Sequence, residues 1–436
     1  MTDKVCVIGA GSSGIAGAQV LHARGIPFDC FEKGSQVGGN WRYLNDNGSS
    51  AAYRSLHINT SRELMAYPSY PMPPHLPDYP SHWDIAAYFD SYVDHFGFRD
   101  SIRFRTEVSS VVPADGGWDV TANGETQRYR AVLVANGHHW DPRWPDPPFP
   151  GEFTGEQLHA HDYREPDVLV GKRVLVLGIG NSACDIAVES SRIADKTFLA
   201  MRRGAYVIPK YLRGRPTDAS STALMSRLPF RVQRALMSAM LKVAAGDMTS
   251  YGLPKPDHKL LSAHPTVSSE LLPRIGHGDI TVKPNIARYD GDSVVFDDGS
   301  RERVDLVVYC TGYRITFPFL DRSVVDTTDN RVPLYRRVVS PDQPGLYFLG
   351  LLQPLGAVMP LAEAQAEWVA DLLQDRCALP SAAAMRAAVA EEDRALAKRY
   401  VASPRHTIEV DFHPYLRVLS RERKRRPSRT AVPSAS

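Results

Sequence analysis

Two glycine-rich segments, each directly after a short apolar run, constrain the fold of this chain more than any other feature. They read Val5-Cys-Val-Ile-Gly9-Ala-Gly11-Ser-Ser-Gly14 and Val174-Leu-Val-Leu-Gly178-Ile-Gly180-Asn-Ser-Ala183. Each apolar run is typical of a buried parallel strand, and each glycine turn opens a stretch with helical spacing. Glycines allow the tight turn and a close approach of backbone N–H groups to a bound pyrophosphate. The sequence therefore predicts an α/β fold with two Rossmann-like units.

The residue that ends the second strand of each unit differs between the two copies. About 20 positions after the first glycine, the first copy has Glu32, whereas the second has Met201 followed by Arg202 and Arg203. A carboxylate accepts hydrogen bonds from ribose hydroxyls, but it would repel a 2′-phosphate, which guanidinium groups attract. We therefore predict FAD at the first unit and NADPH at the second. Glu32 could instead be an ordinary strand-end residue, and at least one arginine an ordinary surface cation.

The same segments supply most of the predicted cofactor-binding residues. For FAD these are Gly9, Gly11, Ser12, Gly14, Glu32, Lys33 and Gly39, and for NADPH they are Gly178, Gly180, Asn181, Ser182, Arg202 and Arg203. Asn181 and Ser182 lie at the predicted start of the second helix, where they could donate to the pyrophosphate. Lys210 is a weaker candidate for the 2′-phosphate.

Composition excludes several other classes of protein. The chain has 436 residues, 43% of them hydrophobic and 23% charged, which predicts a globular protein of at least two domains. A net charge of +2 provides no general attraction to nucleic acid. The five cysteines are scattered without a C-x-x-C pair, which argues against a disulfide framework, a metal site and a disulfide reductase.

We expect a cytoplasmic protein with no membrane partner. No stretch approaches the ~18 apolar residues of a membrane span, and the first strand begins too early to leave room for a signal peptide. A basic run at 421–426, followed by a Pro- and Ser-containing end, predicts a disordered tail over 421–436. The oligomeric state stays open, with a homodimer as one option.

The first unit needs later strands to complete its sheet, so we predict that the second domain is inserted into the first. The expected ranges are 1–164 for the first part of the FAD domain, 165–280 for the NADPH domain and 281–420 for the second part of the FAD domain. A proline-dense segment over 141–151 is predicted to link them. A hairpin at 294–300 and helices over 222–245 and 361–374 are also predicted.

Together these segments resemble class B flavoprotein monooxygenases, and most closely the flavin-containing monooxygenases that oxygenate nitrogen or sulfur. The resemblance spans nearly the whole chain. Besides the two glycine segments it rests on four motifs: Asn59-Thr-Ser-Arg-Glu-Leu-Met65, Phe153-Thr-Gly155-Glu-Gln-Leu-His159-Ala-His-Asp-Tyr163, Cys310-Thr-Gly-Tyr313 and Gly350-Leu-Leu-Gln-Pro354. Arg405-His-Thr-Ile-Glu-Val410 is also similar to the family. Membrane-bound members carry an apolar C-terminal anchor that this chain lacks, which supports the expectation of a soluble protein.

The resemblance implies the reaction and further site residues. NADPH reduces FAD, reduced flavin captures O2 as a C4a-hydroperoxyflavin, and a small amine or sulfide takes one oxygen atom. Asn59 matches the family asparagine near the flavin and is our candidate catalytic residue, although a loop Asn more often stabilises a turn. Trp41 and Gln353 match positions near FAD, but either could be a packing residue. His159 we interpret as a structural linker residue in preference to a general base.

Two other activities stay open. A Baeyer–Villiger monooxygenase would act on ketones, but relatives with that activity usually carry Trp where this chain has Tyr163. An uncoupled NADPH oxidase would release only H2O2, and the sequence cannot distinguish it because coupling depends on fine sealing of the site.

Overall fold

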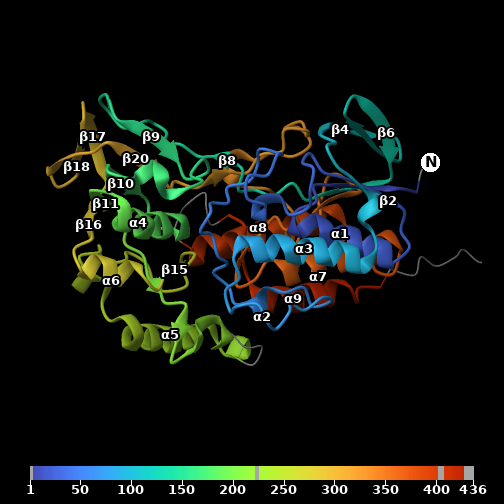
Figure 1. Cartoon of the computed structure of the whole chain (residues 1–436). Coiled ribbons are helices and arrows are strands. Elements are labelled where there is room, and N and C mark those ends of the chain that lie inside the picture. The colour runs from blue at the N-terminus through green and yellow to red at the C-terminus, as the bar shows by residue number, and fades with distance from the viewer. Residues whose placement is uncertain (1–2, 221–224, 401–406, 427–436) are drawn as a thin grey trace, which may run out of the picture.

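The computed structural model describes residues 3–220, 225–400 and 407–426, which build two parallel β-sheets flanked by helices. The sheet that contains β9, β10 and β20 lies at the left of Figure 1, and the unit built around β2, α1, α3 and α7 lies at the right. The prediction of an α/β fold with parallel sheets is confirmed.

The first sheet has the strand order β22-β7-β1-β2-β3. Its strands are β1 (Val5–Ile8), β2 (Phe28–Phe31), β3 (Ile102–Arg103), β7 (Ala131–Val134) and β22 (Leu346–Phe348). Four strands come from the first third of the chain, whereas β22 returns from far downstream and pairs with β7 in parallel. β1 and β7 are buried at every position, as expected for parallel strands covered on both faces.

The second sheet has the order β16-β11-β10-β20-β9. Its strands are β9 (Glu156–His159), β10 (Arg173–Leu177), β11 (Lys196–Ala200), β16 (Ile280–Lys283) and β20 (Leu306–Tyr309). All of them lie, in sequence, between β7 and β22 of the first sheet. The sheet reaches beyond the predicted range 165–280 at both ends, because β20 and β9 close it through long-range parallel pairing that local sequence patterns do not reveal.

Helices cover the two main sheets, and the shorter strands form separate small sheets. In the first unit α1 (Ser12–Ala23) packs between α3 (His82–Phe96) and α7 (Met359–Leu373), and in the second unit α4 (Asn181–Ile193) packs on β10 and β11. The other helices are α2 (Arg62–Met65), α5 (Phe230–Ala245), α6 (Leu271–Gly276), α8 (Ala382–Arg399) and α9 (Phe412–Glu422). The other strands are β4 (Val108–Ala114), β5 (Gly117–Ala122), β6 (Glu125–Tyr129), β8 (Asp141–Pro142), β12 (Val207–Ile208), β13 (Tyr211–Leu212), β14 (Arg215–Pro216), β15 (Thr266–Val267), β17 (Ile286–Asp290), β18 (Ser293–Phe296), β19 (Arg301–Arg303), β21 (Tyr313–Arg314), β23 (Gln353–Leu355) and β24 (Glu409–Asp411).

Local predictions outside the glycine segments have mixed outcomes. The hairpin predicted at 294–300 is confirmed by the antiparallel pair β18–β19, and the helix predicted over 361–374 corresponds to α7. The helix predicted over 222–245 begins only at Phe230, and residues 221–224 lie outside the described residues. Its shorter extent follows from Pro229, which disfavours the helical conformation of the residue before it.

The basic segment 421–426 differs from the predicted tail. The first two of its residues end α9, and the guanidinium of Arg423 lies 2.6 Å from the Asp371 carboxylate. The backbone oxygen of Arg425 accepts a hydrogen bond from Ala378. These contacts with α7 and the turn after it give the segment a fixed place, which charge density alone did not predict. The rest of the predicted tail, 427–436, lies outside the described residues.

Candidate active site

The first glycine turn connects β1 to α1 with almost no space for side chains. Gly9 has φ +98°, and a Cβ there would lie 2.7 Å from the backbone oxygen of Ala135 at the end of β7. A Cβ on Gly14 would lie only 1.8 Å from the backbone oxygen of Gly9. These two glycines are therefore required by the packing of the protein itself.

Gly11 is different, because a Cβ there would meet no protein atom closer than 3.6 Å, the Cα of Gly39. Gly11 caps α1 without a side-chain hydrogen bond, and the first turn, which Ser12 opens, carries no acidic residue. The first N–H groups of α1 are thus left for an anion, and the two facing glycines keep the approach free of side chains. The turn fits a dinucleotide pyrophosphate.

Glu32 directly follows β2 as a buried acceptor, with 3% of its surface exposed. Its carboxylate accepts hydrogen bonds of 2.8 Å from both Ala10 N and Gly34 N, and one of 3.1 Å from Asn47 Nδ2. Three donors hold the carboxylate beside the glycine turn. Lys33 instead extends to the surface, where its Nζ lies 2.9 Å from Glu107 Oε1. The structure therefore brings Glu32, but not the Lys33 ammonium, to the turn.

The second glycine turn repeats the backbone geometry of the first. Gly178 has φ +133°, and a Cβ there would lie 2.7 Å from the backbone oxygen of Cys310, just after β20. Gly180 caps α4 without a side-chain hydrogen bond, and Ser182 is half-buried in the first turn. Asn181 Oδ1 accepts a 2.8 Å hydrogen bond from Val267 N, so this side chain holds β15 against the turn.

The three residues directly after β11 differ in burial. Met201 is buried, and both Arg202 and Arg203 are exposed. Arg203 Nε lies 3.4 Å from Asp257 Oδ2. A hydrogen bond from His258 lowers the pKa of Asp257, and the Arg203 charge lowers it further.

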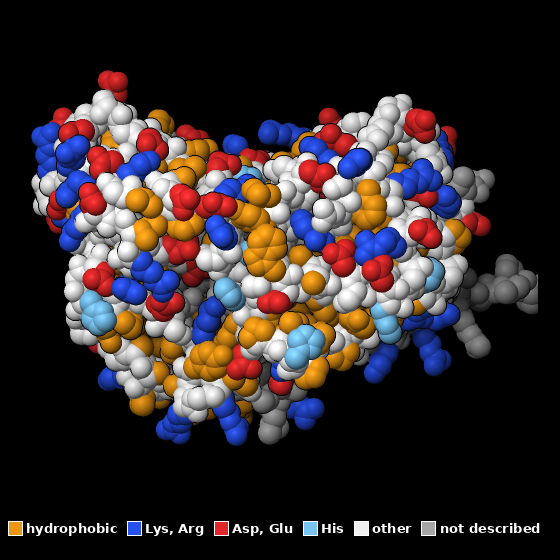
Figure 2. Space-filling model, viewed as in Figure 1, with side chains coloured by type: hydrophobic (Ala, Val, Ile, Leu, Met, Phe, Trp, Pro, Cys, Tyr) orange, Lys and Arg blue, Asp and Glu red, His pale blue; other side chains and the backbone are white. Residues whose placement is uncertain are grey.

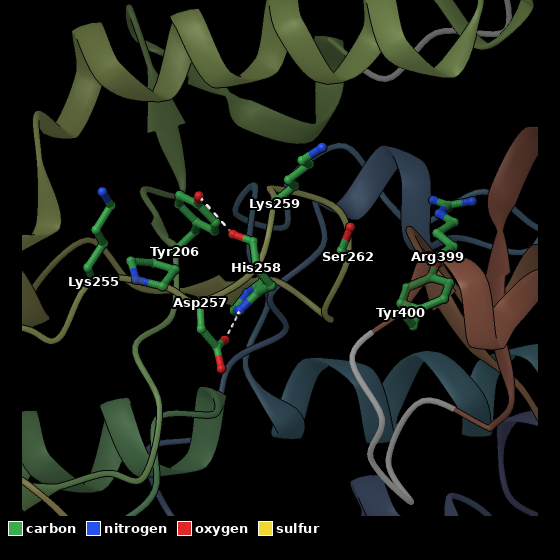
Figure 3. A pocket seen from close by; sticks show the side chains of 9 residues that line it. Tyr206, Lys255, Asp257, His258, Lys259, Ser262, Arg399 and Tyr400 are labelled. Atoms are coloured by element: carbon green, nitrogen blue, oxygen red, sulfur yellow. Dashed lines mark hydrogen bonds and ion pairs between the residues drawn. The ribbon is translucent and has the colours of Figure 1, made fainter.

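Asp257 belongs to a cleft of about 700 Å³ between the loop 255–262 and the end of α8. Figure 3 shows Lys255 and Lys259 on the same loop as Asp257, while Arg399 and Tyr400 approach from the other side. The His258 backbone oxygen accepts from the Tyr206 hydroxyl at 3.1 Å. The two lysines add cations to the cleft that Asp257, the ion-pair partner of Arg203, also lines. Sequence reasoning missed them because their loop lies far along the chain from β11.

A single loop connects the two glycine turns. It starts at Gly39 opposite Gly11 and includes Asn40, whose Oδ1 accepts from Ala51 N at 2.8 Å. It continues to Tyr53, whose hydroxyl donates to Asp185 in the first turns of α4. Burial raises the pKa of Asp185 to about 6, against the opposing effect of the Tyr53 hydrogen bond. The loop thus ties the first unit to the second where their helices begin.

Asn59 lies further along the same connection with its polar group unsatisfied. Its Oδ1 is buried, and no described residue gives it a hydrogen-bond partner. The neighbouring backbone is held from the second unit, because Lys210 Nζ donates to Ile58 O at 3.2 Å and Ser61 N donates to Asp218 Oδ2 at 2.6 Å. Burial lowers the pKa of Lys210. Sequence reasoning did not find Asp218, which no motif marks.

Trp41 and the segment that leads to Gln353 also lie near the first turn. Trp41 ends the short helix η1 (Gly39–Trp41), next to the glycine that faces Gly11. The segment before Gln353 crosses the start of α1 so closely that a Cβ on Gly350 would lie 1.9 Å from Ser13 Oγ. Gln353 then begins β23, and its N–H donates to Ile408 O at 2.8 Å.

The linker histidine is buried. His159 is 1% exposed, its Nδ1 accepts from His161 N at 3.0 Å, and burial lowers its pKa to about 4. The hydroxyl of Tyr163, also buried, donates to Glu189 on α4 at 2.7 Å.

Among the described residues no cluster of three or more His, Cys, Asp or Glu could hold a metal ion. Within the same residues, no helix has both the length and the apolar character needed to cross a bilayer.

Comparison with known proteins supports the family resemblance along nearly the whole chain. A family model described as FMO-like, flavin-binding monooxygenase-like, matches residues 2–432. Flavin-containing monooxygenase 5 of Oryctolagus cuniculus is 38% identical over 430 residues, which cover 94% of this chain and 80% of that relative. Dimethylaniline monooxygenase [N-oxide-forming] 2 of Mus musculus is 35% identical over 444 residues, covering 97% and 83%.

A solved structure shows the same arrangement. S-allyl-L-cysteine S-oxygenase from Allium sativum matches with a TM-score of 0.73 at 27% identity, covering 98% of this chain and 89% of that one. The family resemblance predicted from the sequence is thereby confirmed, and with it the predicted cofactors FAD and NADPH. The chain belongs to the flavin-containing monooxygenases, which are NADPH-dependent oxidoreductases that use FAD.

Proposed function

We propose that this enzyme transfers one oxygen atom from O2 to a soft nucleophilic nitrogen or sulfur of a small molecule. The observation that carries the proposal is the buried, unpartnered amide oxygen of Asn59, six residues after the Tyr53 end of the loop that connects the two glycine turns. An amide offers both donors and an acceptor without titrating, so it can hold a polar ligand group in a site from which water is excluded.

In this proposal each cofactor has its own turn. FAD lies at the β1–α1 turn, with its pyrophosphate on the uncapped N-terminus of α1 and its ribose at the Glu32 carboxylate. NADPH lies at the β10–α4 turn, with its 2′-phosphate at Arg202 and Arg203. When bound, FAD accepts an electron pair from NADPH and delivers it to O2.

The residues of the protein then hold the reacting groups together and keep water away. The 39–53 loop is joined to the first turn by the hydrogen bond from Gly38 N to Ala10 O, braced internally by Asn40 and held at α4 by Tyr53, so it can fix the separation of the two cofactors. Lys210 and Asp218 hold the backbone on either side of Asn59 and thereby aim its amide. Little acid–base chemistry is required of the side chains, and His159 is neutral near pH 7 because burial lowers its pKa to about 4.

The relatives support nitrogen and sulfur as targets. The name of the mouse relative specifies N-oxide formation, and that of the garlic structure specifies S-oxygenation. The cytoplasmic location and the homodimer stay predictions.

Replacement of Asn59 tests the proposal. Asn59→Leu and Asn59→Asp should retain FAD and anaerobic reduction by NADPH, because reduction depends only on the alignment of the cofactors. Aerobic NADPH oxidation should continue while the electrons go to H2O2, since loss of one preorganised polar group at developing charge costs about 3 kcal/mol. The measurement is product formed per NADPH consumed with trimethylamine and with a thioether.

A loop asparagine of the second unit provides the matched control. Asn285, whose backbone oxygen accepts from Asp297 N, should tolerate Asn285→Asp with unchanged coupling. If both Asn59 variants form as much product per NADPH as the unmodified enzyme, Asn59 only stabilises a turn. Ester formation from a ketone by the unmodified enzyme, with neither amine nor sulfide oxygenated, would show a Baeyer–Villiger monooxygenase, and H2O2 alone would show an oxidase.

A further inference from the structure

Strand β24 begins with a buried carboxylate that accepts no hydrogen bond from any described residue. Glu409 is 2% exposed, and both of its carboxylate oxygens lack such a partner. One basic group is within reach, because His264 Nδ1 lies 3.5 Å from Glu409 Oε1. A buried carboxylate without hydrogen bonds is costly, so the place of Glu409 in the fold requires an explanation.

Glu409 belongs to the first unit and is tied to its glycine turn. β24 pairs with β23 in parallel, with Glu409 opposite Gln353, and Gln353 N donates to Ile408 O at 2.8 Å. Shortly before Gln353 the chain crosses the start of α1, where Gly350 lies directly against Ser13. Glu409 therefore has a fixed position relative to the turn proposed for FAD.

His264 belongs to the second unit and is tied to the other glycine turn. Two residues after it, Thr266 Oγ1 donates at 2.6 Å to the backbone oxygen of Ile179, which lies inside that turn. Val267 N donates at 2.8 Å to Asn181 Oδ1 at the start of α4. The position of His264 is therefore linked to the turn proposed for NADPH.

The pair thus spans the boundary between the two units. In Figure 1, β15, which closely follows His264, lies where the second unit approaches the first. In the same view, Figure 2 shows side chains packed across the boundary below a notch in the upper outline of the molecule. The 39–53 loop crosses the boundary through Tyr53 and Asp185. His264 and Glu409 form a second connection, made by two ionisable side chains.

Three further ionisable side chains lie around Glu409, namely Arg399, Tyr400 and Asp411. Arg399 Nη2 donates to Asp411 Oδ1 at 2.7 Å, so these two charges compensate each other. Burial raises the pKa of Tyr400, against the effect of Arg399, and the charges of Asp411 and Glu409 raise it further. Tyr400 is therefore uncharged near neutral pH. Histidine, in contrast, ordinarily changes its charge between about pH 5 and 8.

We propose that Glu409 is a positioning residue for hydride transfer from NADPH to FAD, and that protonated His264 is the group it holds. The inference rests on the proposed placement of the two cofactors at their turns. A neutral imidazole leaves the buried carboxylate without a countercharge, whereas an imidazolium supplies both a charge and a donor. The charged pair holds the NADPH turn against the flavin turn and so fixes the distance over which the hydride moves. The contact is strongest when His264 is protonated and weakens as the pH rises.

Anaerobic reduction of the FAD-loaded enzyme by saturating NADPH tests the proposal. The rate constant of the unmodified enzyme should be higher at about pH 6 than at about pH 8.5, where histidine is neutral. Glu409→Gln keeps the shape of the side chain and removes its charge. It should lower the rate at the lower pH at least about fivefold and leave the rate at the higher pH similar. Asp185, which also titrates near pH 6, is common to both enzymes, so the difference between their pH profiles isolates Glu409.

His264→Asn should have the same effect as Glu409→Gln. The double variant should be no slower than either single variant, because both substitutions remove one and the same contact. Hydrogen exchange followed by mass spectrometry adds a measurement that does not depend on turnover. At about pH 6 the segment 262–267 should exchange faster in Glu409→Gln than in the unmodified protein, and at about pH 8.5 the two should be similar.

His277→Asn and Glu125→Gln are the matched controls. His277 Nδ1 lies 4.0 Å from Asp279 Oδ2, but the His277 side chain is 71% exposed, and Glu125 is exposed on β6. Both controls should keep the reduction rate and its pH profile, and every variant should keep its flavin, since the first glycine turn is unchanged.

Equal rates of Glu409→Gln and the unmodified enzyme at both pH values would overturn the proposal. So would a loss of rate that is the same at both pH values, or additive effects of the Glu409 and His264 substitutions. Because no O2 is present, these results do not depend on whether an amine or a sulfide is oxygenated. Normal flavin reduction without oxygenated product would refute only the proposed function.

Discussion

The two glycine turns share one backbone geometry but differ in the side chains that follow their second strands. At the first turn, the group proposed for the ribose is a buried carboxylate that three donors of the protein hold. At the second, the groups proposed for the 2′-phosphate are two exposed arginines, one of them paired with Asp257. A preorganised buried acceptor suits a cofactor that stays bound. Exposed cations suit one that exchanges, since they attract it without a large desolvation cost.

The glycines of these turns also fall into two groups, according to the contacts that an added Cβ would make. Gly9, Gly14 and Gly178 are required by contacts within the protein, whereas a Cβ on Gly11 would meet only Gly39, at 3.6 Å, so no packing contact of the protein requires this glycine. A single glycine motif therefore contains residues for folding and a residue for binding, and substitution can separate them.

The largest effect is expected for Gly14→Ala. The new methyl group would overlap the Gly9 backbone oxygen, so helix and strand must separate, at a cost of about 3 kcal/mol or more in the free energy of unfolding. Gly11→Ala is the matched comparison, because its methyl group would meet only Gly39 at ordinary contact distance. It should keep the stability of the flavin-free protein and lose flavin. Urea unfolding and flavin content per chain measure both, and equal stability losses would remove the distinction.

The next effect concerns the second turn. Arg202→Ala combined with Arg203→Ala should lower the preference for NADPH over NADH, since each charged hydrogen bond to the 2′-phosphate contributes about 1.5–3 kcal/mol. Flavin content should not change, because Glu32 and the first turn are untouched. The ratio of kcat/KM for the two nucleotides is the measurement, and an unchanged ratio would place the phosphate elsewhere. Lys255→Ala combined with Lys259→Ala then shows whether the cleft in Figure 3 contributes.

A smaller effect is expected for Glu32→Gln. The amide can accept from only some of the three donors, because its NH2 group faces an N–H group, so we expect a loss of about 2 kcal/mol in FAD affinity. Lys33→Gln, next to it on the surface, is the control and should bind FAD normally. Titration of the flavin-free protein with FAD gives the two dissociation constants. Equal affinities for the Glu32 variant and the unmodified protein would contradict the ribose assignment.

The smallest effect concerns the contact between the two units. Burial raises the pKa of Asp185 to about 6, above the ~3.9 of an unfolded aspartate. The stabilising contribution of its protonated form is therefore full below about pH 4 and is lost as the pH rises through 6. Asp185→Asn keeps an acceptor for Tyr53 and removes the titration. Relative to the unmodified protein, the variant should gain just under ~2 kcal/mol between pH 4.5 and 7.5, measured by urea unfolding. A constant difference across this range would refute the assignment.

Sequence alone identified the parts of the molecule that depend on local chemistry. A strand, a glycine turn and a helix are specified within one short segment, and so are Glu32 and the Arg202–Arg203 pair at the ends of their strands. The two units and their cofactor preference could thus be predicted. Family motifs added Asn59, although nothing in the local sequence indicates that its buried amide oxygen is left unpaired.

Only the tertiary structure decided what meets across long distances in the chain. It closed the second sheet with β9 and β20, brought Lys210 and Asp218 beside the backbone around Asn59, and placed Lys255 and Lys259 in the cleft lined by Asp257, the ion-pair partner of Arg203. It also left Val232, Leu236 and Val243 of α5 exposed, although the same periodicity in the sequence is equally consistent with a helix buried in the core. Periodicity tells which residues share a face, but packing decides whether that face meets protein or solvent, because burial depends on partners that are remote in sequence.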